Sequence, residues 1–113
     1  MQVGSLAGRM MDFPLTLTHF LERARTLFGR SEIVSRMPDR SIHRHTFADF
    51  HRRSSQLAGA LARLGVRPGD RVASLAWNNH RHLELYFGVP CSGAVLHTLN
   101  LRLTPEELAF IIN

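Results

Sequence analysis

Two closely spaced histidine pairs, His43 with His45 and His80 with His82, are the first candidates for metal chemistry. Residues two apart on a strand share a face, so the rings of His43 and His45 are predicted to lie side by side. On a helix two residues subtend about 200°, so His80 and His82 are predicted to point in opposite directions. For His43 and His45 no cysteine or carboxylate lies nearby as a third ligand, so we predict a polar strand face and no metal site there, and the opposed rings make His80 and His82 weaker candidates still.

Cys91 and His97 are the next candidates, as a nucleophile and its base. A thiolate nucleophile needs an adjacent imidazole and an orienting group, and nothing in the sequence brings these two residues together. A cysteine near a helix end is more often a small buried hydrophobe. As the single cysteine, Cys91 also excludes an internal disulfide and a cysteine-based zinc knuckle. Asp70 is predicted to stabilise a turn. We therefore predict no catalytic residue in this chain.

Phosphate chemistry has one candidate residue. The chain has no glycine-rich phosphate loop, since Gly65 and Gly69 only flank a turn that leads into a strand. Arg102, however, lies just past the carboxyl end of a predicted parallel strand, where open α/β sheets bind their ligands. The alternative, an exposed arginine in a strand-to-helix loop, stays open.

The composition is that of a globular protein. In 113 residues, 44% are hydrophobic and 20% charged, and the net charge of +5 comes from 14 arginines with no lysine at all, which excludes lysine chemistry. The arginines form no run longer than Arg52-Arg53, so nucleic-acid binding is not predicted. No stretch is apolar enough to cross a membrane, and Met1–Met11 lacks the apolar core of a secretory signal. We expect a cytoplasmic protein.

The first half of the chain is predicted to form two helices around a hairpin. Apolar residues at spacings of three and four predict a helix from Leu17 to Phe28, which Gly29 would end. A Pro-Asp turn between residues 32–36 and 42–46 predicts two antiparallel strands. Thr46 is a suitable N-cap for a second helix, which would continue to Leu64 and end at Gly65, with Arg52, Arg53, Gln56 and Arg63 displayed on its polar face.

The second half predicts parallel strands. Two short apolar runs, 72–76 and 94–97, are separated by a helix that Asn78 or Asn79 would cap and that would reach about Ser92. Such an arrangement predicts a βαβ crossover. Thr104-Pro105-Glu106-Glu107 combines an N-cap, a proline at the first helical position and a capping-box glutamate, so it predicts a last helix. Because this helix has no stop signal and the sheet would be left bare, we predict an incomplete α/β fold cut from a larger domain.

Several segments, in this order and spacing, resemble the AMP-forming acyl-CoA synthetases of the adenylate-forming superfamily, within them the fatty-acid–CoA ligase type. The segments that carry the resemblance are Met11–Leu15, Phe20–Ala24, Glu32–Arg36, Ile42–Arg44, Thr46–Phe50, Leu64–Ala73, Trp77-Asn78, Arg81–Glu84, Gly93–Asn100 and Arg102–Leu108. The resemblance identifies residues 1–113 as the N-terminal part of an AMP-binding domain, with the hairpin and the start of a βαβ parallel sheet belonging to its large domain.

The resemblance also implies a reaction for the parent enzyme. Family members join a carboxylic acid to coenzyme A (CoA): ATP first forms an acyl-adenylate and releases pyrophosphate, and the thiol then displaces AMP. The parent enzyme would thus use ATP, Mg²⁺ and CoA, whereas this piece alone would bind none of them and would not be catalytic, because the phosphate loop and the catalytic lysine lie further along in relatives.

Within this piece, the resemblance places Asn100 and Arg102 near the CoA nucleotide, where a guanidinium fork would suit a phosphate. The sequence departs from the family pattern at two positions: Leu101 stands where many relatives have proline, and Cys91 stands where many have glycine. The alternative is a non-catalytic dimerisation or binding module derived from the same subdomain, with Leu17–Phe28 as the surface that would pair with a second copy. Homodimers are common among relatives.

Overall fold

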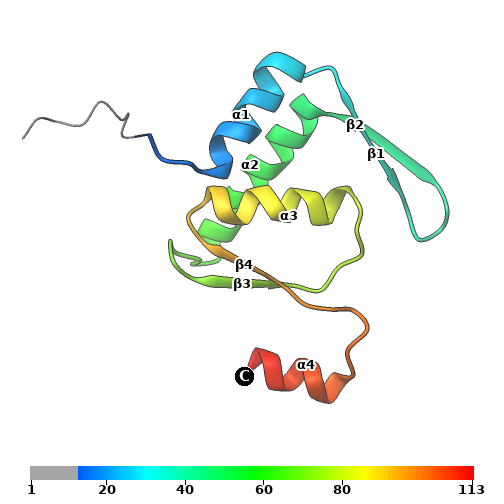
Figure 1. The fold of residues 1–113 in the computed structure, drawn as a ribbon, viewed down its shortest axis with the longest axis vertical. Helices are drawn as coiled ribbons and strands as arrows, with labels where there is room; N and C mark the ends of the chain where they lie inside the picture. Colours follow the sequence, from blue (N-terminus) through cyan, green and yellow to red (C-terminus); the bar gives the residue numbers. More distant parts are fainter. Residues whose placement is uncertain (1–12) are drawn as a thin grey trace, which may run out of the picture.

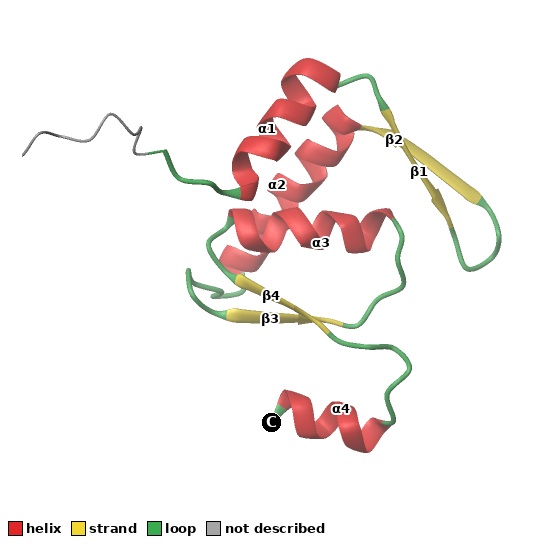
Figure 2. Ribbon diagram, viewed as in Figure 1, coloured by secondary structure: helices red, strands yellow, loops and turns green. Residues whose placement is uncertain are grey.

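The computed structural model describes residues 13–113, so the segment Met1–Met11, for which no leader is predicted, and the first residues of Met11–Leu15 lie outside it. The described part contains four helices and four strands (Figures 1 and 2). In chain order they are α1 Leu17–Phe28, β1 Glu32–Arg36, β2 Ile42–Thr46, α2 Phe47–Arg63, β3 Arg71–Ser74, α3 His80–Cys91, β4 Val95–Thr98 and α4 Pro105–Ile112. None of the helices within residues 13–113 has the length and hydropathy that a bilayer crossing requires.

The predicted hairpin is confirmed. Strands β1 and β2 are antiparallel, with Glu32 opposite Thr46 and Arg36 opposite Ile42. In the turn, Asp39 Oδ1 accepts hydrogen bonds from the Ser41 amide at 3.0 Å and the Ser41 hydroxyl at 2.6 Å. These bonds lower the pKa of Asp39, the hydroxyl contributing most. The turn is therefore closed by its own side chains.

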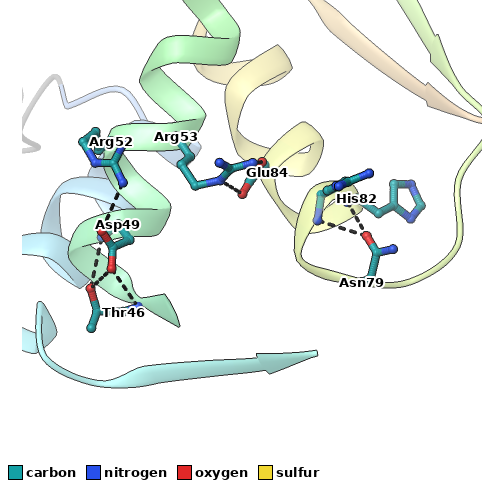
Figure 3. Close-up of polar contacts among 8 residues, drawn as sticks. Thr46, Asp49, Arg52, Arg53, Asn79, His82 and Glu84 are labelled. Carbon is teal, nitrogen blue, oxygen red and sulfur yellow. Dashed lines mark hydrogen bonds and ion pairs between the residues drawn. The ribbon is translucent and has the colours of Figure 1, made fainter. Parts of the chain in front are cut away.

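Helix α2 begins and ends as the sequence predicts. Thr46 Oγ1 accepts from the Asp49 amide at 3.1 Å while Asp49 Oδ2 accepts from the Thr46 amide, so the two residues form a capping box (Figure 3). The Thr46 hydroxyl, and after it the Arg52 guanidinium, lowers the pKa of Asp49 to about 2. Gly65 follows the helix with φ of 93°, the left-handed conformation that only glycine adopts without strain.

Helices α2 and α3 cross with almost no space between them. A Cβ added to Gly88 would lie 2.9 Å from Leu57 Cδ2 and 3.0 Å from the Ser54 carbonyl oxygen, so the contact requires glycine. Val89 and Ser54 are fully buried beside it. Helix α1 joins this pair through Glu22 of α1, whose Oε1 lies 2.7 Å from His51 Nε2 of α2. Figure 1 shows the three helices packed together.

The same interface contains an ion pair that sequence reasoning missed. Arg53 is predicted to lie on the solvent face of α2, but its guanidinium reaches α3 and donates two hydrogen bonds to Glu84, with Nη2 3.1 Å from Oε2 (Figure 3). The Glu84 side chain is only 8% exposed and that of Arg53 41%. The pair raises the pKa of Arg53. A carboxylate this buried requires its partner.

The predicted βαβ crossover is confirmed. Strands β3 and β4 are parallel, with Arg71 opposite Val95 and Ser74 opposite Thr98, and α3 connects them. Strand β3 ends before the predicted residue 76, because its last ladder bond is donated by the Leu99 amide to the Ser74 carbonyl. In Figure 2, α3 lies on one side of this strand pair and α4 on the other. The predicted fold class, an α/β fold with a hairpin and a small parallel sheet, is therefore confirmed.

The hydrophobic core of the described residues is small. Four hydrophobic residues are buried, namely Leu21, Phe50, Val89 and Ala94. Helix α4 opens with the predicted capping box between Thr104 and Glu107, yet it buries none of its residues, and Phe110 is 87% exposed. With so little apolar surface removed from water, the conformational entropy lost on folding is barely offset.

We expect the 113-residue chain, produced alone, to unfold without a sharp transition and to self-associate, because its core is small and the edges of its two-stranded sheets are open. Thermal unfolding followed by circular dichroism, together with sedimentation velocity, measures both properties. A cooperative melt of a monomer would contradict the expectation.

We expect Arg53→Met to lower the helix signal of the chain more than Arg52→Met does. The substitution leaves the Glu84 carboxylate without its partner, a loss of about 1 to 3 kcal/mol for a partly exposed pair. Arg52→Met is the matched control, since Arg52 lies next in sequence and pairs with Asp49 at a more exposed site, where about 1 kcal/mol or less is lost. Far-ultraviolet circular dichroism compares the two variants, and equal signals would show that the buried pair contributes nothing special.

Candidate functional site

A groove lies where three loops of the molecule meet. It is lined by residues 36–38 at the end of β1, 76–79 after β3 and 100–102 after β4, and its volume is about 620 Å³. Because β3 and β4 are parallel, both contribute loops at their carboxyl ends, the edge at which open α/β sheets bind ligands. The size is typical of a site for a small molecule or cofactor.

Both residues that the sequence selects line this groove. The Asn100 side chain folds back on its own loop, where its Oδ1 accepts a hydrogen bond of 3.0 Å from the Arg102 amide. The Leu103 amide donates to the Asn100 carbonyl at 3.2 Å, which closes the turn. The Arg102 residue itself is exposed. The structure therefore brings Asn100 and Arg102 together in one groove, while what they bind stays a prediction.

Two further residues of the groove were not selected from the sequence. Arg36 enters it from the hairpin, and Trp77, 67% exposed, enters it from the loop after β3. The sequence did contain a signal for Trp77, because a residue directly after a strand of a parallel sheet lies at the ligand-binding edge. Arg36 had none, since its place depends on how the hairpin packs against the rest of the molecule.

The loop that carries Trp77 is held by the start of α3. Asn79 Oδ1 accepts from the amides of Arg81 at 3.0 Å and His82 at 3.3 Å, the N-cap that the sequence predicts (Figure 3). The His82 ring lies between Asn78 Oδ1, at 3.1 Å from Nδ1, and the Ser74 hydroxyl, at 3.3 Å from Nε2. His82 thus connects the helix to the end of β3, across the loop.

The histidines of the hairpin meet one from α3. His43 and His45 share a face, as predicted, with ring centroids 5.2 Å apart. His80 stacks on His43 at 3.9 Å and lies 5.5 Å from His45. His80 packs on the hairpin, whereas His82 contacts Ser74 and Asn78. The predicted polar strand face is wrong for His45, which is buried against His80, and grouping three imidazoles across two elements was not foreseen. We define these three residues, His43, His45 and His80, as the histidine cluster.

The histidine cluster has the geometry of packed rings. His43 and His80 are stacked with an angle of 22° between ring planes, and the nitrogen lone pairs lie in those planes, so they do not converge on one point. Among residues 13–113 no group of three or more His, Cys, Asp or Glu side chains is arranged to hold a metal ion. The cluster therefore acts as a contact between the hairpin and α3.

Burial keeps two of these rings neutral. His45 and His80 are buried, and this desolvation, followed by the neighbouring His43, lowers the pKa of both. Arg53 lowers the pKa values further, whereas Glu84 raises them and Asp49 raises that of His45. Both nitrogens of His45 and Nδ1 of His80 have no hydrogen-bond partner among the described residues. Protonation would thus place a charge in a site that offers it few partners.

The remaining candidate residues from the sequence, Asp70, Cys91 and His97, lie outside the groove. Asp70 Oδ2 accepts from the Arg67 amide at 2.8 Å, so it stabilises the predicted turn. Cys91 lies half-buried in the last turn of α3, whereas His97 is exposed on β4, opposite Ala73. Within the described part of the chain no hydrogen bond joins Cys91 to His97.

We expect the helix signal of the chain to decrease as pH falls below about 6.5, the ordinary histidine pKa. His45 and His80 have lowered pKa values in the folded state, so the unfolded state binds protons first, and stability present above that pH is lost on acidification. His80→Gln should weaken this pH dependence, and His97→Gln, at an exposed site, should not. A pH titration by circular dichroism measures it, and identical curves for His80→Gln and the parent chain would contradict the cluster's role.

Residues 21–113 match the model of the AMP-binding enzyme family. The chain is 52% identical over 112 residues to a long-chain-fatty-acid–CoA ligase of Thermus thermophilus, a match that covers 99% of this chain and 21% of that protein. It is 40% identical over 108 residues to 3-methylmercaptopropionyl-CoA ligase of Ruegeria lacuscaerulensis, covering 96% of this chain and 20% of that protein.

The fold has counterparts among solved structures as well. The inhibitor-bound N-terminal domain of FACL13 from Mycobacterium tuberculosis superposes with a TM-score of 0.77 at 29% identity, over 86% of this chain and 24% of that one. The chain spans about a fifth of the length of the curated relatives it matches, 21% and 20% for the two ligases. The resemblance noted from the sequence is thereby confirmed at the level of the family: the chain belongs to the AMP-binding enzyme family.

Proposed function

We propose that this chain is the N-terminal part of an AMP-forming acid–thiol ligase that acts on a medium- or long-chain fatty acid. The full reaction would convert the acid, ATP and CoA into acyl-CoA, AMP and pyrophosphate. In the second step the thiol sulfur bonds to the acyl carbon, the bond from that carbon to the AMP phosphate oxygen breaks, and AMP leaves. The names of the two ligases above support the reaction class, and their different acids leave the acyl group to experiment.

Within that enzyme, residues 1–113 would supply binding surface rather than reacting groups. The observation that carries this proposal is the groove at the carboxyl ends of β3 and β4, in which the exposed Arg102 lies beside Asn100. A guanidinium presents several donors in a planar fork that matches a phosphate, so Arg102 is the residue we assign to a phosphate of the CoA nucleotide. Asn100 would keep the Arg102 backbone in place.

A magnesium ion, which ATP chemistry requires, has no visible set of ligands here. Residues 13–113 bring together no group of three acidic or histidine side chains that could hold a metal ion.

One observation favours a second function. Helix α1 leaves four large apolar side chains in water: Leu17, Phe20, Leu27 and Phe28, which are 41%, 65%, 59% and 49% exposed. An exposed apolar surface of this kind is typical of an interface. A non-catalytic dimerisation module would use α1 in this way, and the same surface would serve an enzyme that forms homodimers.

We expect the complete gene product that contains residues 1–113 to catalyse exchange of pyrophosphate into ATP when a medium- or long-chain fatty acid is added. This assay reports the first half-reaction and needs no CoA. Omission of the acid is the control. If neither fatty acids nor thioether acids stimulate exchange, the ligase proposal is wrong.

Sequencing of the gene beyond the codon for Asn113 separates the two functions, because a stop codon there would favour the dimerisation module.

A further inference from the structure

We infer that the groove is a two-arginine phosphate site in which Arg36 of the hairpin acts together with Arg102, and that Trp77 is the surface against which the base of the same nucleotide stacks. The inference rests on the proposed function and extends it, because it assigns two residues, from elements far apart in the sequence, to recognition of the 3′-phosphate and the adenine of CoA. Arg36 would then contribute, together with Arg102, to the distinction between CoA and dephospho-CoA.

The charged residues that line the groove are all positive. The groove contains two guanidinium groups, Arg36 and Arg102, and none of the groove-lining residues in the described part of the chain is acidic. Arg36 and Arg102, like most arginines within residues 13–113, take part in no ion pair there, so both guanidinium groups are available to a ligand. Both residues line the same groove, so an anion bound there would be attracted by two positive charges.

The asparagines of the groove add to this preference for an anion. Oδ1 of Asn79 accepts from the amides of Arg81 and His82, and Oδ1 of Asn100 from the amide of Arg102. Oδ1 of the third asparagine, Asn78, lies 3.1 Å from His82 Nδ1. The oxygens are therefore engaged within the protein, and the NH₂ groups of these side chains are left for a ligand. The groove thus offers donors, which phosphate oxygens accept.

Arg36 is held where it can serve this purpose. It is the last residue of β1, paired with Ile42 of β2, and the turn beyond it is closed by the bonds between Asp39 and Ser41. The Asp39 carboxylate accepts those bonds within the turn. On the other strand, His43 stacks on His80 at 3.9 Å, which anchors the hairpin to α3. The backbone of Arg36 therefore belongs to a braced element, and its side chain is exposed at the groove.

Trp77 supplies the apolar part of the site. Its indole is 67% exposed in a groove whose other apolar residues are Met37, Pro38, Ala76 and Leu101. An exposed aromatic ring beside arginines is the usual arrangement for stacking a nucleotide base above a phosphate. A purine with a phosphate on its ribose fits both halves of the groove, whereas inorganic phosphate would use only the arginines.

The test uses the complete gene product and measures KM for CoA and for dephospho-CoA in acyl-CoA formation, with pyrophosphate exchange measured in parallel. We expect Arg36→Gln to raise KM for CoA on the order of tenfold, the effect of a charged hydrogen bond, and to leave KM for dephospho-CoA and the exchange rate unchanged. Arg44→Gln is the matched control, since Arg44 lies on the same hairpin and pairs with Glu32. Trp77→Ala should raise KM for both cosubstrates, and Trp77→Phe should restore most of the affinity.

The outcomes separate the two proposals. If exchange is normal and Arg102→Gln raises KM for CoA but Arg36→Gln does not, the proposed function stands and the two-arginine site is wrong. If exchange is absent in the unaltered protein, the proposed function fails, and binding of adenosine 3′,5′-bisphosphate by equilibrium dialysis decides the groove alone. Weaker binding by Arg36→Gln than by Arg44→Gln then supports the site, and equal binding overturns it.

Discussion

The close crossing of α2 and α3 is the contact on which the other parts of this structure depend. Gly88 allows the helices to approach to the point where any larger residue would overlap Leu57 and the Ser54 carbonyl. The buried pair of Arg53 and Glu84 then adds a polar contact whose geometry tolerates little change. Helix α3 is also the crossover between the two parallel strands, so its position on α2 determines where the sheet begins.

Helix α3 also positions the elements that line the groove. The amino end of the helix holds the loop after β3 through Asn79 and His82, and its His80 receives the hairpin through His43 and His45. Arg36 and Trp77 are thus both placed by contacts with the first turn of one helix. In a molecule with so small a core, the polar and aromatic contacts around α3 are therefore what position the groove.

Local sequence signals predicted nearly all the elements because those signals are local in their physics. Thr46, Thr104 and Asn79 cap helices by bonding amides within three residues of themselves. Gly65 ends α2 because its left-handed backbone can be read from residue type. Gly29 is different: it follows α1 with φ of −54°, an ordinary helical value, so the helix ends there without the conformation that glycine permits. The boundary is right, although the usual reason for it is absent.

The sequence by itself determined the helices and the hairpin, because these follow from contacts between near neighbours. It also determined the parallel crossover, the family resemblance and the placement of Asn100 and Arg102 after a strand, because these follow from the order of the segments. Only the tertiary structure decided the partners of residues that act across elements. Arg53 was expected in solvent and instead pairs with Glu84, His80 joins two histidines of the hairpin, and Arg36 shares a groove with Arg102. These pairings depend on the crossing of α2 and α3 and on the docking of the hairpin, and no periodicity in a single chain segment encodes the distance between two such elements.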